Sequence, residues 1–166
     1  MVIQCDTRQQ MHKKHHQIKE KWFINHGHTV VHSKCLVADY ICPSNGSVAV
    51  DTKQSVSELY NDLIQDHRRF HDECVHAKEY GIKLYILVEN KYGYTKPEDI
   101  RTWKNPQYFQ YKKARWNGVT RKPPASNVTL IKIMHSMHRD YGVEFLFCDV
   151  NDAAKIIVKL LGGKHE

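Results

Sequence analysis

The sequence LVADYICPSNGSVAVDTKQSVSEL, residues 36–59, decides the fold of this chain. Two runs rich in apolar and β-branched residues, Leu36–Ile41 and Val48–Lys53, predict neighbouring strands. Between them, Pro43-Ser44-Asn45-Gly46 is typical of a hairpin turn. The start of a helix follows the second strand.

Three charged side chains are expected to meet on this hairpin. Side chains alternate between the two faces of a strand, so Asp51 and Lys53 point the same way. Asp39 stands near the end of the partner strand, where the twist of the hairpin brings it beside Asp51. Two carboxylates and an ammonium at a sheet edge suit a hard divalent cation and an activated water. The alternative is a surface ion pair between Asp51 and Lys53, which is common on strands.

Around the hairpin, strands and helices alternate, which predicts an α/β fold with a mixed central sheet and helices on both faces. The other expected strands are Val2–Asp6, His28–Ser33, Ile82–Glu89 and Val143–Cys148, and the expected helices are Met11–Trp22, Ser55–Tyr80, Asn127–Met137 and Asp152–Leu161.

Two of these helices carry polar residues that bear on function. On Ser55–Tyr80 the apolar stripe leaves Asp62 and Arg68 on the solvent side, whereas Asp66 and Glu73 lie within or beside it. The His15-His16 pair on the first helix is expected on a solvated face, without a metal role.

Length and composition predict one domain over residues 1–166. No run of about 18 apolar residues predicts a membrane span, and the N-terminus has no signal-peptide pattern. The five cysteines lack CxxC spacing, which disfavours a zinc ribbon and predicts reduced, buried thiols. We therefore expect a protein inside the cell: in the cytoplasm of a microbe or phage-infected cell, or in the nucleus of a eukaryote.

The net charge of +7 lies in one segment. Residues Lys91 to Lys122 hold nine of the 25 Lys and Arg but only two of the 18 Asp and Glu, so the remainder of the chain is balanced. Seven aromatic residues are interleaved with these charges, as in surfaces that bind phosphates and stack on bases. We expect a basic insertion over residues 91–123 that contacts DNA; the alternative is a small subdomain with its own core.

Several short motifs, in this order, resemble the XPF-type nuclease domain of the PD-(D/E)XK, or restriction-endonuclease-like, superfamily. The motifs that carry the resemblance are Asp6-Thr7-Arg8-Gln9, Val37-Ala38-Asp39-Tyr40, Asp51-Thr52-Lys53, Asp66-His67-Arg68, Ile86-Leu87-Val88-Glu89, Tyr141-Gly142-Val143 and Asp152-Ala153-Ala154. The likeness covers nearly the whole chain except the basic insertion.

The resemblance implies a Mg²⁺-dependent DNA endonuclease, with Mn²⁺ able to substitute. Its metal ligands would be Asp39, Asp51 and the Thr52 carbonyl, and Lys53 would position or deprotonate the attacking water. Further acidic or amide side chains expected near this site are Asp6, Gln9, Glu58, Asp66 and Glu73. The residues expected to contact DNA are Arg8, Arg68, Lys104, Lys112, Lys113, Arg115, Trp116, Arg121 and Lys122.

Departures from the family pattern leave alternatives open. Gln9 stands where the family has Glu, Ala38 replaces a Gly, and the appended helix-hairpin-helix module is absent. The expected substrate is branched or partly single-stranded DNA, cut as a flap, fork or junction. The alternatives are a non-catalytic DNA-binding or scaffold subunit of a nuclease complex and a restriction-like enzyme that reads sequence. Members of the family dimerise, and the apolar region Leu130–Leu161 could supply a homodimer face.

Overall fold

The computed structural model describes residues 1–8 and 14–162, so Gln9 lies outside the described residues. It contains a six-stranded sheet with the strand order β2-β1-β3-β4-β5-β6. In chain order the elements are β1 (Val2–Cys5), α1 (Lys14–Asn25), β2 (Thr29–His32), β3 (Tyr40–Cys42), β4 (Asn45–Lys53), α2 (Val56–Tyr60), the π-helical turn η1 (Asn61–Gln65), α3 (His67–Glu79), β5 (Lys83–Glu89), the 3-10 helix η2 (Pro97–Thr102), α4 (Pro106–Trp116), α5 (Asn127–Tyr141), β6 (Glu144–Cys148) and α6 (Ala153–Leu160).

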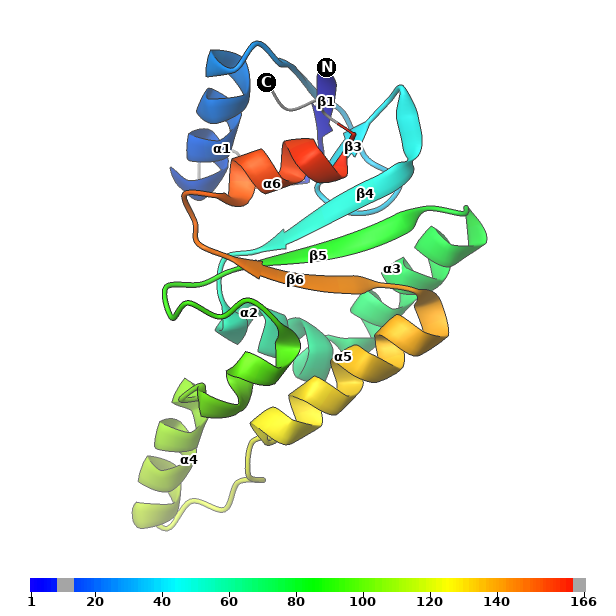
Figure 1. Cartoon of the computed structure of the whole chain (residues 1–166). Helices are drawn as coiled ribbons and strands as arrows, with labels where there is room; N and C mark the ends of the chain where they lie inside the picture. Colours follow the sequence, from blue (N-terminus) through cyan, green and yellow to red (C-terminus); the bar gives the residue numbers. More distant parts are fainter. Residues whose placement is uncertain (9–13, 163–166) are drawn as a thin grey trace.

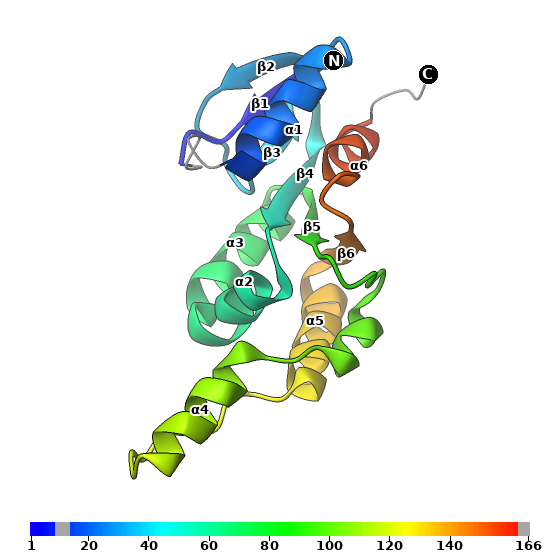
Figure 2. The ribbon, with the colours of Figure 1, turned by 90° about the vertical axis from the view of Figure 1, so that its left-hand side faces the viewer.

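The sheet is mixed, as the sequence predicts. β3 runs antiparallel to both β1 and β4, whereas β4, β5 and β6 are parallel to one another and β1 is parallel to β2. Helices α1 and α6 cover one face and α2, α3 and α5 the other (Figure 1, Figure 2). Alternate residues of one strand enter the two cores: Ala49 packs on the α3 side and Val50 on the α6 side. The α/β fold with helices on both faces is therefore confirmed.

The hairpin differs from its prediction at the first strand. Its turn is only Pro43 and Ser44, and β3 begins at Tyr40, so residues 36–39 form a loop before the strand. Ala38 explains the late start, because its φ of 61° is incompatible with an extended strand. Asp39 therefore sits at the entrance of β3, still opposite β4, where its N–H donates to the Val50 carbonyl over 3.2 Å.

The predicted long helix Ser55–Tyr80 is interrupted. A π-helical turn at η1 separates α2 from α3, with the Asp66 N–H donating to the Asn61 carbonyl over 2.9 Å. The extra residue in this turn shifts the helical phase. Asp62, which the uninterrupted pattern places on the solvent side, is only 7% exposed.

The first helix is also more buried than its sequence indicates. His16 is buried, and its Nδ1 lies 3.4 Å from the Tyr40 hydroxyl. Lys19, 2% exposed, forms an ion pair with Glu89 at the end of β5. The expectation that His16 lies on a solvated face is therefore wrong, because this part of α1 packs across the sheet above β3 and β5.

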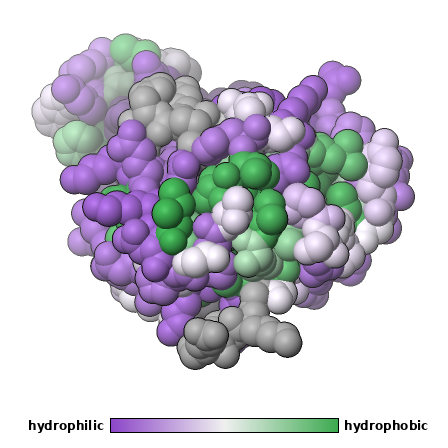
Figure 3. Space-filling view, turned by 90° about the horizontal axis from the view of Figure 1, so that it is seen from above, coloured by the Kyte–Doolittle hydropathy of each residue, from purple (hydrophilic) through white to green (hydrophobic). Residues whose placement is uncertain are grey.

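The apolar residues of α5 and α6 are used inside the chain. They are buried in the two cores: Leu130, Ile131, Met134, Met137, Ala153, Ala154, Ile157, Val158 and Leu161. Ile133, Ile156 and Leu160 are only partly buried, and the homodimer face expected in Leu130–Leu161 remains a prediction. Seen from above, the end of the molecule that carries α1 and α6 shows a central group of apolar side chains surrounded by hydrophilic ones (Figure 3).

Two sequence-based expectations concern the chain as a whole. All five cysteines are buried and unpaired, as predicted, and burial raises the pKa of Cys5 and Cys74 to about 12. None of the described helices has the length and apolar character needed to cross a membrane.

Candidate active site

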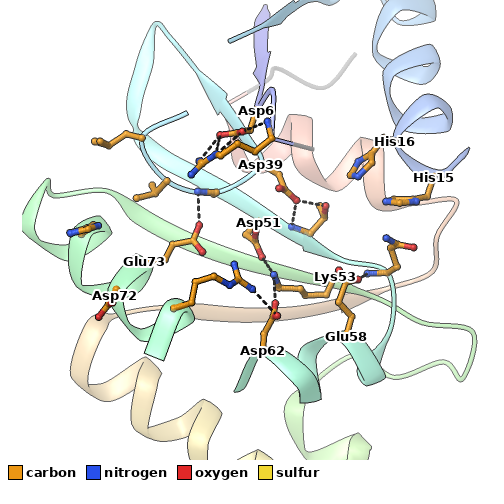
Figure 4. A pocket seen from close by; sticks show the side chains of 18 residues that line it. Asp6, His15, His16, Asp39, Asp51, Lys53, Glu58, Asp62, Asp72 and Glu73 are labelled. Carbon is orange, nitrogen blue, oxygen red and sulfur yellow. Dashed lines mark hydrogen bonds and ion pairs between the residues drawn. The ribbon is translucent and has the colours of Figure 1, made fainter. Parts of the chain in front are cut away.

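A polar pocket of about 590 Å³ opens beside the end of β4, between the loop before β3 and helix α3 (Figure 4). Seven acidic side chains line it: Asp6, Asp39, Asp51, Glu58, Asp62, Asp72 and Glu73. Among the residues that the structure describes, only three Lys or Arg do so: Arg8, Lys53 and Arg69. Carboxylates repel one another at short range. Although the chain has a net charge of +7, the acids of this pocket must therefore be offset by cations or hydrogen bonds close to them.

Lys53 lies at the centre of the charged groups. Its Nζ is 2.6 Å from Asp51 Oδ2 and 2.6 Å from Asp62 Oδ2, and all three residues are at most 7% exposed. The Phe70 ring lies 5.7 Å from the same nitrogen. Asp51 and Lys53 therefore point to the same face of β4, as strand alternation predicts, and they are buried rather than a surface ion pair.

The neighbouring acids keep Lys53 charged. Burial lowers the pKa of the Lys53 ammonium, but Asp51 and Asp62 outweigh this effect and raise the pKa above its usual value. Lys53 is thus a fixed positive charge at neutral pH. It can orient a water molecule or a phosphate by charge and hydrogen bonding, but it is a poor general base.

Asp51 is under-compensated despite this ion pair. Its Oδ2 is buried and, although it is close to Lys53, accepts no well-directed hydrogen bond. Burial raises the pKa of Asp51 most, Lys53 opposes the rise, and the negative charges of Asp39 and Glu73 add to it, so the pKa lies well above its usual value. Additional positive charge in the pocket would relieve this repulsion.

Asp39 is held against β4 by Thr52. Its Oδ2 accepts hydrogen bonds from the Thr52 N–H (2.9 Å) and hydroxyl (2.7 Å). These bonds orient the Asp39 carboxylate toward the strand that carries Asp51. The two aspartates therefore line one pocket, in agreement with the expected convergence of the hairpin arms.

The donor set is compatible with a hard cation. Carboxylate and backbone oxygens are the ligands that Mg²⁺ and Mn²⁺ prefer, and the buried, under-compensated Asp51 oxygen is the kind of group a cation would satisfy. Within residues 1–8 and 14–162, no three His, Cys, Asp or Glu side chains are already grouped at ligand spacing. The expected ligands, two carboxylates and one carbonyl, do not require such a group.

Glu73 on α3 supports the loop before β3. Its Oε1 accepts a hydrogen bond of 2.7 Å from the Ala38 N–H. Ala38 has the only positive φ among the described non-glycine residues. Ala38 thus occupies a left-handed backbone position, which glycine adopts without steric cost.

We expect Ala38→Val to destabilise the protein by about 2–3 kcal/mol, because a β-branched side chain is strained at positive φ and has no room at a position that is 4% exposed. The matched variant Ala38→Gly should stay within about 1 kcal/mol of wild type, because relief of backbone strain offsets the lost methyl group. Urea unfolding measures both. Equal destabilisation by Val and Gly would contradict the left-handed conformation.

Asp6 stabilises the wall of the pocket. It accepts hydrogen bonds from the Arg8 guanidinium, from the Arg8 N–H (2.6 Å) and from the Cys35 N–H (2.9 Å). Burial raises the pKa of Asp6, but these hydrogen bonds lower it more, and the net pKa lies below its usual value. Arg8 also lines the pocket and donates to the Cys35 carbonyl over 3.1 Å, and more than half of its side chain is exposed.

The remaining expected site residues lie in three places. Glu58 lines the pocket, but its Oε2 also accepts from the Gln54 N–H at 2.7 Å, and its own N–H donates to the hydroxyl of the N-cap residue Ser55 at 3.2 Å. Asp66 and Arg68 are exposed at the start of α3 and do not line the pocket. Seven others lie on the basic insertion, away from the pocket: Lys104, Lys112, Lys113, Arg115, Trp116, Arg121 and Lys122.

Sequence reasoning missed Asp62 and Arg69. Arg69, rather than Arg68, lines the pocket, and its guanidinium donates to Asp62 Oδ1 over 3.0 Å. Asp62 thus receives Lys53 on one oxygen and Arg69 on the other. Asp62 lies within the π-helical turn, and nothing in the residue pattern indicates that turn.

The fold is similar to that of a solved structure. XPF from Aeropyrum pernix superposes on 97% of this chain with a TM-score of 0.63 at 18% sequence identity. This chain has an XPF-like fold. A second structure, XPF from Aeropyrum pernix in complex with DNA, matches with a TM-score of 0.60 over 96% of this chain, also at 18% identity. The chain spans 63% and 62% of those two XPF chains. No family model and no curated protein matches the sequence.

Proposed function

We propose that this protein is a Mg²⁺-dependent DNA endonuclease that cuts branched DNA such as flaps, forks or junctions. The observation that carries the proposal is the buried Asp51–Lys53–Asp62 arrangement beside Asp39, at the end of β4 in an XPF-like fold. A surface ion pair would need neither the burial nor the surplus of acids. The DNA-bound structure of the similar XPF protein supports DNA as the substrate class.

Asp39, Asp51 and the Thr52 carbonyl would hold the metal ion. When bound, Mg²⁺ would polarise a phosphoryl oxygen and lower the pKa of the attacking water. The under-compensated charge of Asp51 favours cation binding, and the two hydrogen bonds from Thr52 orient Asp39 in advance. This orientation limits the reorganisation that binding requires.

Lys53 would act as the charged group next to the scissile phosphate. Its ammonium is held by Asp51 and Asp62, and its raised pKa keeps it protonated. A fixed positive charge stabilises the negative charge that develops on the phosphate in the transition state. Arg69 would keep Asp62 in place for this task.

The proposal is tested by incubating the full chain with labelled flap, fork, four-way junction and plain duplex DNA, in Mg²⁺, Mn²⁺ or EDTA. We expect cleavage of at least one branched substrate in either metal, slower cleavage of the duplex and none in EDTA. Failure to cut any substrate with either metal would refute the endonuclease. Cleavage of one duplex sequence but not of others would favour a restriction-like enzyme instead.

One observation favours the alternative of a non-catalytic DNA-binding or scaffold subunit. Lys53 already neutralises part of the Asp51 charge, and no ready three-ligand cluster exists among the described side chains. Such a subunit would bind the branched substrates but leave them uncut in every metal tested.

A further inference from the structure

The basic insertion contains a helix, α4, that projects from the body of the protein. We call residues 104–122 the arm. Its helix α4 has 11 residues, and none of them is buried. Figures 1 and 2 both show α4 projecting away from the sheet and its covering helices. An isolated helix of this length is only marginally stable in water. Because α4 does not pack into the core of the chain, its surface is free to contact a partner.

Two aromatic side chains on α4 are held out in solvent. Phe109 is 73% exposed and Trp116 is 91% exposed, and their spacing of seven residues places them on one face of the helix. Lys112 and Lys113 lie between them in the sequence, three and four residues after Phe109, and both are exposed. The face therefore alternates aromatic ring, ammonium and aromatic ring.

The charge of the arm indicates a polyanion as the partner. No Asp or Glu occurs between Asp99 and Asp140. Six Lys and Arg lie on the arm, namely Lys104, Lys112, Lys113, Arg115, Arg121 and Lys122. If the arm contacted phosphates alone, these cations would be sufficient. Exposed rings add stacking on bases, whose faces are accessible only where the strand is unpaired.

Both ends of the arm are attached close to the pocket. At its start, Gln107 Nε2 donates to Asn61 Oδ1 over 3.0 Å, and just after its end the Ala125 N–H donates to the Tyr60 hydroxyl over 2.8 Å. The residue that follows Asn61 is Asp62, which forms an ion pair with Lys53. The base of the arm is therefore anchored to the helical segment that carries Asp62, one of the residues that line the pocket. Eleven residues of helix span about 16 Å, roughly five nucleotides at the spacing of a duplex strand.

We propose that the arm is a binding site for an unpaired strand of DNA, with Phe109 and Trp116 stacking on bases and Lys112 and Lys113 contacting phosphates. The choice of DNA rests on the proposed function. The arm would make the enzyme favour substrates with an unpaired segment of about five nucleotides next to the cut site.

The test measures binding without cleavage. Fluorescein-labelled dT15 and a 15-base-pair duplex are titrated in EDTA with the full chain carrying Asp51→Asn. Adding Phe109→Ala and Trp116→Ala should weaken dT15 binding tenfold or more, and change duplex binding about twofold or less. The matched control is Tyr80→Ala, which removes a ring that is 62% exposed at the end of α3 and should leave both affinities unchanged.

Three results would overturn the proposal: unchanged dT15 binding in the double variant, equal losses on dT15 and duplex, or at least tenfold tighter binding of U15 than of dT15. An unchanged melting temperature of the double variant would show that a lost affinity is not a loss of folding. If dT15 binding depends on the arm but the protein cuts no substrate, the proposed endonuclease is refuted and the proposal for the arm is not. If the protein cuts branched DNA but dT15 binding does not depend on the arm, the proposal for the arm is refuted and the proposed endonuclease is not.

Discussion

Asp51→Asn should lower the rate of single-turnover cleavage by on the order of 10³-fold while leaving DNA affinity within about threefold of wild type. The amide is nearly the same size as the carboxylate but cannot supply the same charge to a metal ion. Lys53→Met should cause a comparable loss, because its side chain reaches the same space without the ammonium that faces Asp51 and Asp62. Cleavage of a labelled flap substrate under enzyme excess measures the rates.

The matched control is Asp72→Asn, which removes one negative charge from the rim of the same pocket. Asp72 is exposed, and its contact is with His71 rather than with Lys53. Its variant should cut within about threefold of wild type. Wild-type rates in Asp51→Asn or Lys53→Met, or an equal loss in Asp72→Asn, would contradict the roles assigned to β4.

Lys19→Ala should lower the free energy of unfolding by about 3–5 kcal/mol, the usual effect of breaking a buried ion pair. Lys19 and Glu89 are 2% and 3% exposed, so the variant leaves the Glu89 carboxylate buried without its cation. Burial already raises the pKa of Glu89, with Lys19 opposing the rise. Without Lys19, the pKa of Glu89 in the folded state rises further. The loss of stability should therefore be largest at neutral pH and should shrink as the pH falls toward 4, where Glu89 is protonated.

Urea unfolding at pH 4.5 and 7.5 measures this loss. Lys21→Ala, an exposed position on the same helix, should change stability by about 0.5 kcal/mol or less. The double variant Lys19→Met, Glu89→Gln should regain most of the loss, because it leaves no buried charge unpaired. A loss below about 1 kcal/mol in Lys19→Ala would mean that water or another group reaches Glu89.

The sheet and its two covering layers were predictable from the sequence. Apolar runs with β-branched residues, such as Leu84–Val88, identify buried strands, and the alternation around Val50 identifies the two faces of β4. The same alternation places Asp51 and Lys53 together. These features depend on local patterns, which is why they could be read without the structure.

The rest of the site depends on backbone details that residue patterns do not contain. The inward position of Asp62 follows from a π-helical turn, and the position of Asp39 follows from the left-handed conformation of Ala38. Similarly, the burial of His16 and Lys19 follows from how α1 packs on the sheet. The first two are local backbone conformations and the third is a tertiary packing effect, and none of them follows from helical or strand periodicity.

The central claim is that Asp51 is part of a cation site, and Mn²⁺ binding to the DNA-free protein tests it most directly. Electron paramagnetic resonance at pH 7.5 counts the bound Mn²⁺ in wild type, Asp51→Asn and Asp72→Asn. We expect at least one Mn²⁺ per chain in wild type and in Asp72→Asn, displaced by excess Mg²⁺, and at least tenfold weaker binding in Asp51→Asn. Equal Mn²⁺ binding by wild type and Asp51→Asn, or none by either, would contradict it.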